Sequence, residues 1–136
     1  MITYSFARNF TQTEAETLFL SVHWESGQYP AQLYNALKQS ETVLTASLPE
    51  LHLAGLMTAV SDGTMNVYFP YLLVHPEARH KEIGRGLVRL MLAHYRQCYR
   101  KILVCPDDRI AFYKSTGLKQ AKSQTAMMHC GFPEVE

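Results

Sequence analysis

The feature that most constrains this chain is a junction between an apolar run and a long amphipathic segment. The run Thr64–Val74 leads into a short polar loop, after which Gly84-Arg85-Gly86 opens a segment with apolar residues at helical spacing. This pattern predicts a strand, a loop and a helix from about residue 84 to residue 99. Backbone N–H groups at the start of a helix have no partner within the helix, and glycines let an anion approach them closely. The junction therefore predicts an anion site built from main chain.

Positive charge is concentrated in the same half of the chain. Eleven of the 13 Lys and Arg residues fall between Arg79 and Lys122, against only three carboxylates, which gives this stretch a net charge of +8. A cationic region favours an anionic ligand such as phosphate, although such charges also commonly solvate the outer faces of helices. The whole chain carries a net charge of only +1, which argues against a nucleic-acid partner.

Known phosphate-binding motifs are absent from the junction. Leu87 and the residues after it do not complete a GxGxxG fingerprint, and the sequence contains no GxxxxGK[ST] loop. The alternative role for Gly84 and Gly86 is close packing against a neighbouring strand. Two glycines in a first turn need one reason or the other, because glycine costs about 1 kcal/mol relative to alanine inside a helix.

Periodicity and turn signals predict the remaining elements. The expected strands are Ile2–Arg8, Thr42–Leu48, Leu51–Ser61, Thr64–Val74, Lys101–Cys105 and Lys122–Cys130, and the expected helices cover about 12–23, a stretch from Pro30, 84–99 and 110–116. Thr11 and Glu14 have the spacing of a capping box. The order β-α-α-β-β-β-α-β-α-β predicts a single domain over residues 1–136 of the α/β (α+β) class. Its central sheet is expected to be mixed, mostly antiparallel and flanked by helices.

The sequence also bears on the compartment. The longest apolar run is about half the ~18 residues that a membrane span needs, and the N-terminus has neither a basic head nor an apolar core. The three cysteines are an odd number without CxxC spacing, which is typical of a reducing compartment. We therefore expect a cytoplasmic protein with no membrane partner. Cysteines and histidines without paired ligand spacing also predict no metal.

Two motifs together resemble the GNAT N-acetyltransferase superfamily. The acetyl-coenzyme A motif of that family (Arg or Gln, two residues, Gly, one residue, then Gly or Ala) is similar to Lys81–Gly86 (KEIGRG). A second motif, an aromatic pair followed by Gly-Phe, is similar to Phe112–Leu118 (FYKSTGL). The resemblance covers nearly the whole chain. The sequence departs from the pattern at three positions, with Lys81 for Arg or Gln, Glu82 where glycine is common, and Pro106 where asparagine is common.

The resemblance implies a GNAT fold and transfer of an acetyl group from acetyl-CoA to a primary amine. The cofactor-binding residues that it implies are Leu73, Val74, Arg79, His80, Lys81, Ile83, Gly84, Arg85 and Gly86. A main-chain N–H, expected to be that of Leu73, would bond the thioester oxygen. Tyr113 matches the family's general-acid tyrosine, because a phenol stays protonated at neutral pH. The alternative role for Tyr113 is the apolar face of a short helix.

The acceptor and the general base are less constrained. Trp24 and Tyr71 indicate a substrate pocket for a small aromatic or apolar amine, although aromatic clusters serve more often as core. Many family members carry a carboxylate where this chain has Phe69-Pro70-Tyr71, which leaves Tyr71, Glu25 and His23 as candidates for the base.

Two other functions remain open from sequence. A chain that retained the anion site without catalysis would be a CoA-sensing regulatory module that binds a protein partner. A chain whose glycines serve only packing would be a structural or interaction domain. A last strand at a sheet edge also makes a homodimer plausible.

Overall fold

A computed structural model describes residues 1–133. Its internal contacts form two units, Met1–Leu103 and a second that begins at Val104. None of the helices within the described residues is both long and apolar enough to span a bilayer.

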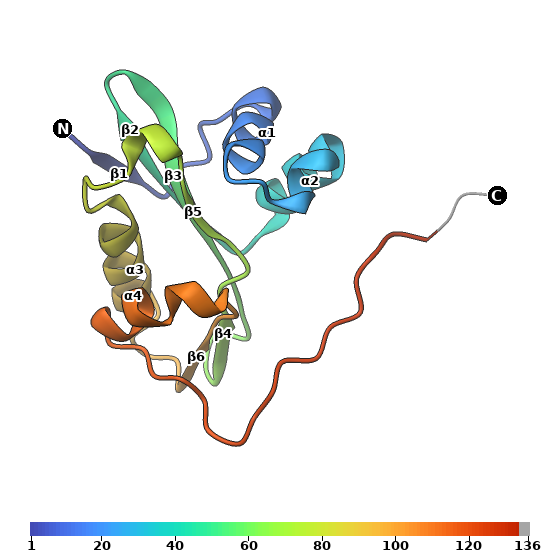
Figure 1. The fold of residues 1–136 in the computed structure, drawn as a ribbon, viewed down its shortest axis with the longest axis vertical. Coiled ribbons are helices and arrows are strands. Elements are labelled where there is room, and N and C mark those ends of the chain that lie inside the picture. Colours follow the sequence, from blue (N-terminus) through green and yellow to red (C-terminus); the bar gives the residue numbers. More distant parts are fainter. Residues whose placement is uncertain (134–136) are drawn as a thin grey trace. The chain divides into compact units, whose positions relative to one another are not determined.

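A six-stranded sheet forms the centre of the first unit (Figure 1). The strands are β1 (Thr3–Ser5), β2 (Thr42–Leu48), β3 (Leu51–Ser61), β4 (Asn66–Tyr68), β5 (Leu72–Val74) and β6 (Arg100–Ile102). They run in the order β1-β2-β3-β4-β6, and β5 also pairs with β3. Every pairing is antiparallel except the parallel pair β4–β6. The mixed, mostly antiparallel sheet predicted from sequence is therefore confirmed.

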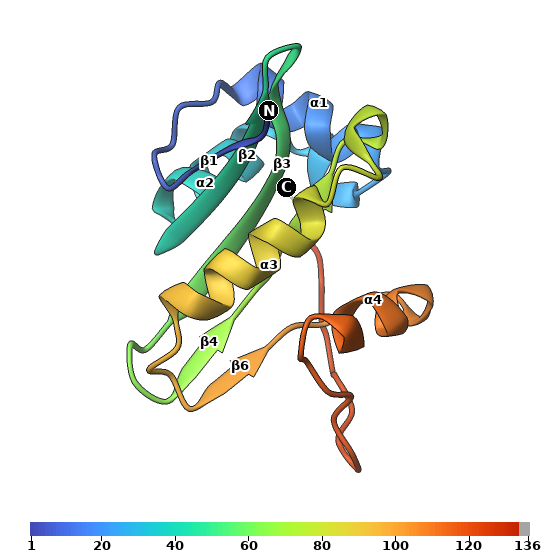
Figure 2. The ribbon, with the colours of Figure 1, turned by 90° about the vertical axis from the view of Figure 1, so that its left-hand side faces the viewer.

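Helices cover both faces of this sheet (Figures 1 and 2). On one face lie α1 (Gln12–Ser21), the 3-10 helix η1 (Glu25–Gln28) and α2 (Pro30–Gln39), and α3 (Ile83–His94) crosses the other. The predicted capping box starts α1, since the Thr11 side chain accepts from the Glu14 N–H and the Glu14 side chain accepts from the Thr11 N–H. Pro30 is the first residue of α2, where its missing N–H costs nothing.

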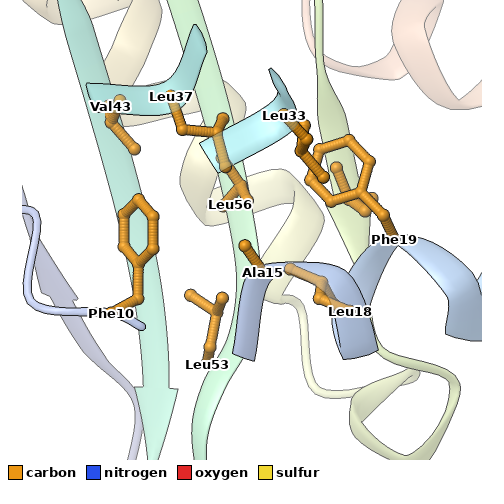
Figure 3. Close-up of a cluster of buried hydrophobic side chains, with 10 residues drawn as sticks. Phe10, Ala15, Leu18, Phe19, Leu33, Leu37, Val43, Leu53 and Leu56 are labelled. Atoms are coloured by element: carbon orange, nitrogen blue, oxygen red, sulfur yellow. The ribbon is translucent and has the colours of Figure 1, made fainter. Parts of the chain in front are cut away.

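The core between the sheet and the first two helices is continuous (Figure 3). Phe10, Ala15, Leu18, Phe19, Leu33 and Leu37 from the helical layer meet Val43, Leu53, Leu56 and Leu73 from the strands. Each fully buried aliphatic or aromatic side chain contributes about 1.5–3 kcal/mol. This burial fixes the helical layer against the middle of β3.

The predicted strand Thr64–Val74 is divided in two. Val60 pairs with Tyr68, and Met57 pairs with Leu72, so three residues of the later segment lie opposite two of β3. This is a β-bulge, and it contains Pro70, which has no N–H to donate to a ladder. Phe69 N–H still donates to the Ile102 carbonyl at 3.0 Å, and β5 then pairs only with β3 among the described residues. Strand β6 therefore follows β4 as far as the bulge and does not continue alongside β5.

The second unit contains η3 (Asp107–Arg109) and α4 (Ile110–Ser115). Gly117 follows α4 with a φ of 102°, as expected for a glycine stop signal. The prediction of a last strand at Lys122–Cys130 is wrong, because no strand pairs with this segment and its residues are exposed. Alternation of residue types predicts a strand only where a partner supplies the ladder.

Arg8 connects the end of β1 to the end of α2. Its guanidinium donates to the carbonyls of Leu37, Lys38, Ser40 and Glu41, which are left without helical partners where α2 stops. Lys38 Nζ donates to the Arg8 carbonyl at 2.8 Å in return. One cation thus satisfies several main-chain acceptors.

Replacing Arg8 with alanine is expected to lower the free energy of unfolding by about 2 kcal/mol, because several charge-assisted hydrogen bonds are lost together. Lysine at the same position offers a point charge without the planar fork, so Arg8→Lys should recover less than half of the loss. Urea denaturation of the two variants measures this. Equal stability of wild type and Arg8→Ala would contradict the role assigned to Arg8.

Candidate functional site

The start of α3 is an uncapped helix N-terminus. Glu82 precedes the helix, and its side chain makes no capping hydrogen bond. The first bond of the helical ladder runs from the Gly86 N–H to the Glu82 carbonyl at 3.0 Å. The N–H groups of Ile83 and Gly84 therefore have no partner within the helix, at the end where the helix dipole favours negative charge. The sequence predicts an anion site at this point, and the structure places these two main-chain donors there.

Gly86 has a different role from the one predicted. Its N–H belongs to the helical ladder, so it is not available to an anion. A Cβ at Gly86 would overlap the hydroxyl and ring of Tyr4 on β1. Burial raises the pKa of Tyr4, which keeps this hydroxyl neutral. The packing explanation is therefore correct for Gly86, and the anion site is limited to the residues before it.

The loop before α3 contains two left-handed residues that are not glycine. His80 has a φ of 67° and Glu82 a φ of 63°, a conformation that costs L-residues roughly 1–2 kcal/mol. The family pattern also fits two residues earlier, on Arg79–Gly84, with Glu82 at its first glycine. The backbone favours this placement, because it puts a glycine position where φ is positive. On this placement the leading cation of the motif is Arg79 rather than Lys81.

Glu82 also changes the electrostatics of the anion site. Its carboxylate is three-quarters exposed and accepts a hydrogen bond from Arg85 Nε at 2.9 Å. The remaining cationic side chains at the loop, those of Arg79, His80 and Lys81, are exposed. Glu82 therefore engages one of the predicted cations and brings a negative charge beside the free N–H groups.

The edge of β5 offers a second set of main-chain donors. Thr58 N–H donates to the Tyr71 carbonyl at 3.0 Å, and His75 N–H donates to the Ala54 carbonyl at 2.8 Å. Hydrogen-bonded pairs alternate along an antiparallel ladder, so Leu73 also bonds to β3, and the N–H groups of Leu72 and Val74 point away from it. Among the described residues, no strand pairs with β5 on the side that these two donors face. The prediction that the Leu73 N–H is the donor is therefore wrong by one residue.

Trp24 and Tyr71, the two predicted substrate-binding residues, lie together. Their ring centroids are 5.1 Å apart, and both rings pack edge-on against the buried Phe19. We call Phe19, Trp24 and Tyr71 the aromatic cluster. The Tyr71 hydroxyl is 2.8 Å from Ser26 Oγ in η1.

The candidates for the general base gather around η1. Glu25 is its first residue, and His23 lies just before it with a φ of 61°. Tyr71 reaches the same short helix through the Ser26 contact. No local sequence pattern pointed to Ser26, because its contact with Tyr71 spans 45 residues.

Tyr113 lies on α4 in the second unit, beside Phe112, with ring centroids 5.0 Å apart. Burial raises the pKa of Tyr113 to about 12, Cys105 adds to the shift and Arg109 opposes it. The phenol is therefore protonated throughout the neutral and mildly alkaline range, as a proton donor requires.

A hollow of about 350 Å³ lies at the opposite end of α3 from the anion site. Three of its polar lining groups already bond to one another, since the Tyr95 hydroxyl donates to Glu41 Oε2 at 2.6 Å and lies 2.6 Å from Thr42 Oγ1. Burial and the bond to Glu41 raise the pKa of Tyr95 to about 12. This hollow presents bonded groups, whereas the anion site and the β5 edge present unbonded N–H groups.

Known proteins resemble this chain in structure rather than in sequence. No family model matches the sequence, and no curated protein matches it. A GNAT-family acetyltransferase from Streptococcus pneumoniae is 24% identical, with a TM-score of 0.82 over 96% of this chain and 98% of its own. Glucosamine-6-phosphate N-acetyltransferase from Arabidopsis thaliana is 12% identical, with a TM-score of 0.70 over 94% and 98%.

A protein described as something other than an acetyltransferase also has a similar structure. A transcriptional regulator from Bacillus halodurans is 17% identical, with a TM-score of 0.72 over 96% of this chain and 100% of its own. At these identities the likeness establishes architecture. The mostly antiparallel sheet flanked by helices agrees with that architecture, and this chain has the fold of the GNAT N-acetyltransferase superfamily.

Proposed function

We propose that the chain is an acetyl-CoA-dependent N-acetyltransferase that acts on the primary amine of a small molecule. The observation that carries this proposal is a pair of main-chain donor sets joined by one short loop. The N–H groups of Leu72 and Val74 line an open strand edge, and those of Ile83 and Gly84 begin α3. An extended ligand with an anionic head and an amide-bearing arm matches both sets.

The described residues fit CoA in this way. Ile83 and Gly84 N–H bind the diphosphate, and Arg79, His80 and Lys81 supply positive charge around it. The pantetheine arm runs back along β5, where Val74 N–H bonds to the arm and Leu72 N–H lies at the thioester end. Glu82 opposes binding, because its carboxylate repels phosphate.

When bound, acetyl-CoA supplies an activated acetyl thioester. The Leu72 N–H stabilises the negative charge that develops on the thioester oxygen, a contribution of about 3 kcal/mol for such donors. The acceptor nitrogen forms the amide bond as the carbon–sulfur bond breaks, and the amine proton leaves through a base near η1. The family resemblance of the motif Phe112–Leu118 assigns the role of proton donor to the departing sulfur to Tyr113.

A CoA-sensing regulatory module is the second candidate. It is favoured by the structural likeness to a protein described as a transcriptional regulator, and by the absence of a carboxylate at Phe69-Pro70-Tyr71. Binding of acetyl-CoA without turnover of any amine in a broad panel would favour this candidate over the enzyme.

Isothermal calorimetry with CoA tests the anion site. Arg79→Gln should weaken CoA binding about tenfold, because a charge-assisted contact to phosphate is lost. Arg96→Gln is the matched control, since Arg96 is also exposed but follows the other end of α3, and it should leave the affinity unchanged. No heat with wild-type protein at millimolar CoA would refute the proposed function.

Glu82 provides a test of both charge and backbone strain. Glu82→Gln and Glu82→Gly should each tighten CoA binding several-fold, because both remove a negative charge beside phosphate. Only Glu82→Gly should also raise the free energy of unfolding, by about 1 kcal/mol, because glycine adopts a φ of 63° without strain. Unchanged affinity in both variants would show that the carboxylate does not face the ligand.

Tyr113→Phe should lower kcat by about a hundredfold and leave the CoA affinity unchanged, because only proton donation is lost. Tyr99→Phe, at an exposed tyrosine, is the control. Since the pKa of Tyr113 is raised to about 12, the donor stays protonated as pH rises, and the rate should show no fall from this group below about pH 11. Full activity of Tyr113→Phe would exclude the residue from the mechanism.

A further inference from the structure

The hydroxyl of Thr58 is the starting point for a further inference. Thr58 lies in the middle of β3 with none of its surface exposed, within the otherwise apolar stretch Leu53–Ala59. Among residues 1–133, its Oγ1 is the buried side-chain polar atom without a hydrogen-bond partner. Leaving such a group unsatisfied costs about 1–3 kcal/mol, so an orphaned hydroxyl at a rigid position requires an explanation.

The aromatic cluster lies on the same face of the sheet as this hydroxyl. Thr58 N–H donates to the Tyr71 carbonyl, which makes the two residues direct cross-strand partners. Side chains of such partners project to the same face, about 5 Å apart at Cβ. Tyr71 in turn contacts Phe19, which Figure 3 shows in the layer between the helices and the sheet. The side chains of Thr58 and Tyr71 therefore project from neighbouring strands into the same layer.

A single side-chain hydrogen bond ties this ring to η1. The Tyr71 hydroxyl and Ser26 Oγ are 2.8 Å apart, and both Tyr71 and Trp24 are partly exposed. The η1 helix is one turn long and follows the left-handed His23. Gly27 lets it approach α1, since a Cβ there would meet the Leu20 side chain at 2.9 Å. This hydrogen bond is therefore the polar contact that has to break before a ligand can enter between Tyr71 and η1.

We propose that Thr58 is a specificity-determining residue for the acceptor amine. This inference rests on the proposed function. The acceptor's apolar or aromatic body enters between the Tyr71 ring and η1 when the Ser26 contact opens, and a hydroxyl at its far end bonds to Thr58 Oγ1. The amine is then at the β5 end, because Leu72 follows Tyr71 directly, whereas Thr58 lies one strand further from the open edge.

The substrate class follows from this arrangement. Rings on the walls favour an aromatic or apolar body, and a single buried hydroxyl favours one hydrogen-bonding group opposite the amine. An acceptor that lacks this group leaves Thr58 unpaired, as it is in the closed arrangement.

Trp24 allows a direct binding test, because it is the only tryptophan in the chain and belongs to the cluster. Its fluorescence is titrated with tyramine and with 2-phenylethylamine, which differ by one hydroxyl, under excitation that phenols do not absorb. Wild-type protein should bind tyramine about five- to tenfold more tightly. Thr58→Val should abolish this preference and leave the affinity for 2-phenylethylamine unchanged, and Thr58→Ser should retain it.

Thr45→Val is the matched control, because Thr45 is also a buried strand threonine but its hydroxyl already donates to the Ser5 carbonyl. This variant should keep the wild-type preference. Thermal denaturation verifies folding, and Thr58→Val should be at least as stable as wild type because it removes an unsatisfied hydroxyl. Equal binding of the two amines by wild type, or an undiminished preference in Thr58→Val, would overturn the inference.

Calorimetry with CoA on the same preparations separates the two levels of the argument. Normal CoA binding without discrimination between the amines refutes the role of Thr58 alone. Absence of CoA binding refutes the proposed function, whatever the amines do.

Discussion

The interruption of hydrogen bonding at Pro70 is the constraint on which the rest of the site depends. Proline has no N–H to give to a ladder, and the extra residue around it turns β5 away from β6. In an uninterrupted strand the N–H groups of Leu72 and Val74 would donate hydrogen bonds to a neighbouring strand. The bulge leaves them without a strand partner among the described residues, while Leu73 holds β5 to β3.

The start of α3 completes this arrangement by the same means. The N–H groups of Ile83 and Gly84 have no partner within the helix, and the side chain of Glu82 does not cap it. The left-handed residues of the loop turn the chain from β5 into the helix. Burial on both faces of the sheet holds these two donor sets in place. The site is therefore made mostly of main chain, and the side chains around it adjust charge and specificity.

The sequence predicted those features that depend on local pattern. The bounds of β2 and β3, the capping box of α1 and the proline at the start of α2 all agree with the structure. Predictions were wrong, or were not made, for features that depend on residues distant in the sequence. The register with β3 decides which N–H groups of β5 have no strand partner. Gly86 is required because Tyr4 on β1 occupies the position of a Cβ. The Thr58 hydroxyl has no hydrogen-bond partner because of side chains that lie far from it in the sequence.

The most direct measurement is the response of individual backbone amides to CoA, followed by nuclear magnetic resonance of nitrogen-15-labelled protein. The account predicts large shifts for the amides of Leu72, Val74, Ile83 and Gly84, with those of Leu73 and Gly86 moving much less because β3 and the helical ladder already hold them. Shifts that spare all four of the first set, or that are largest at Leu73 and Gly86, would contradict it.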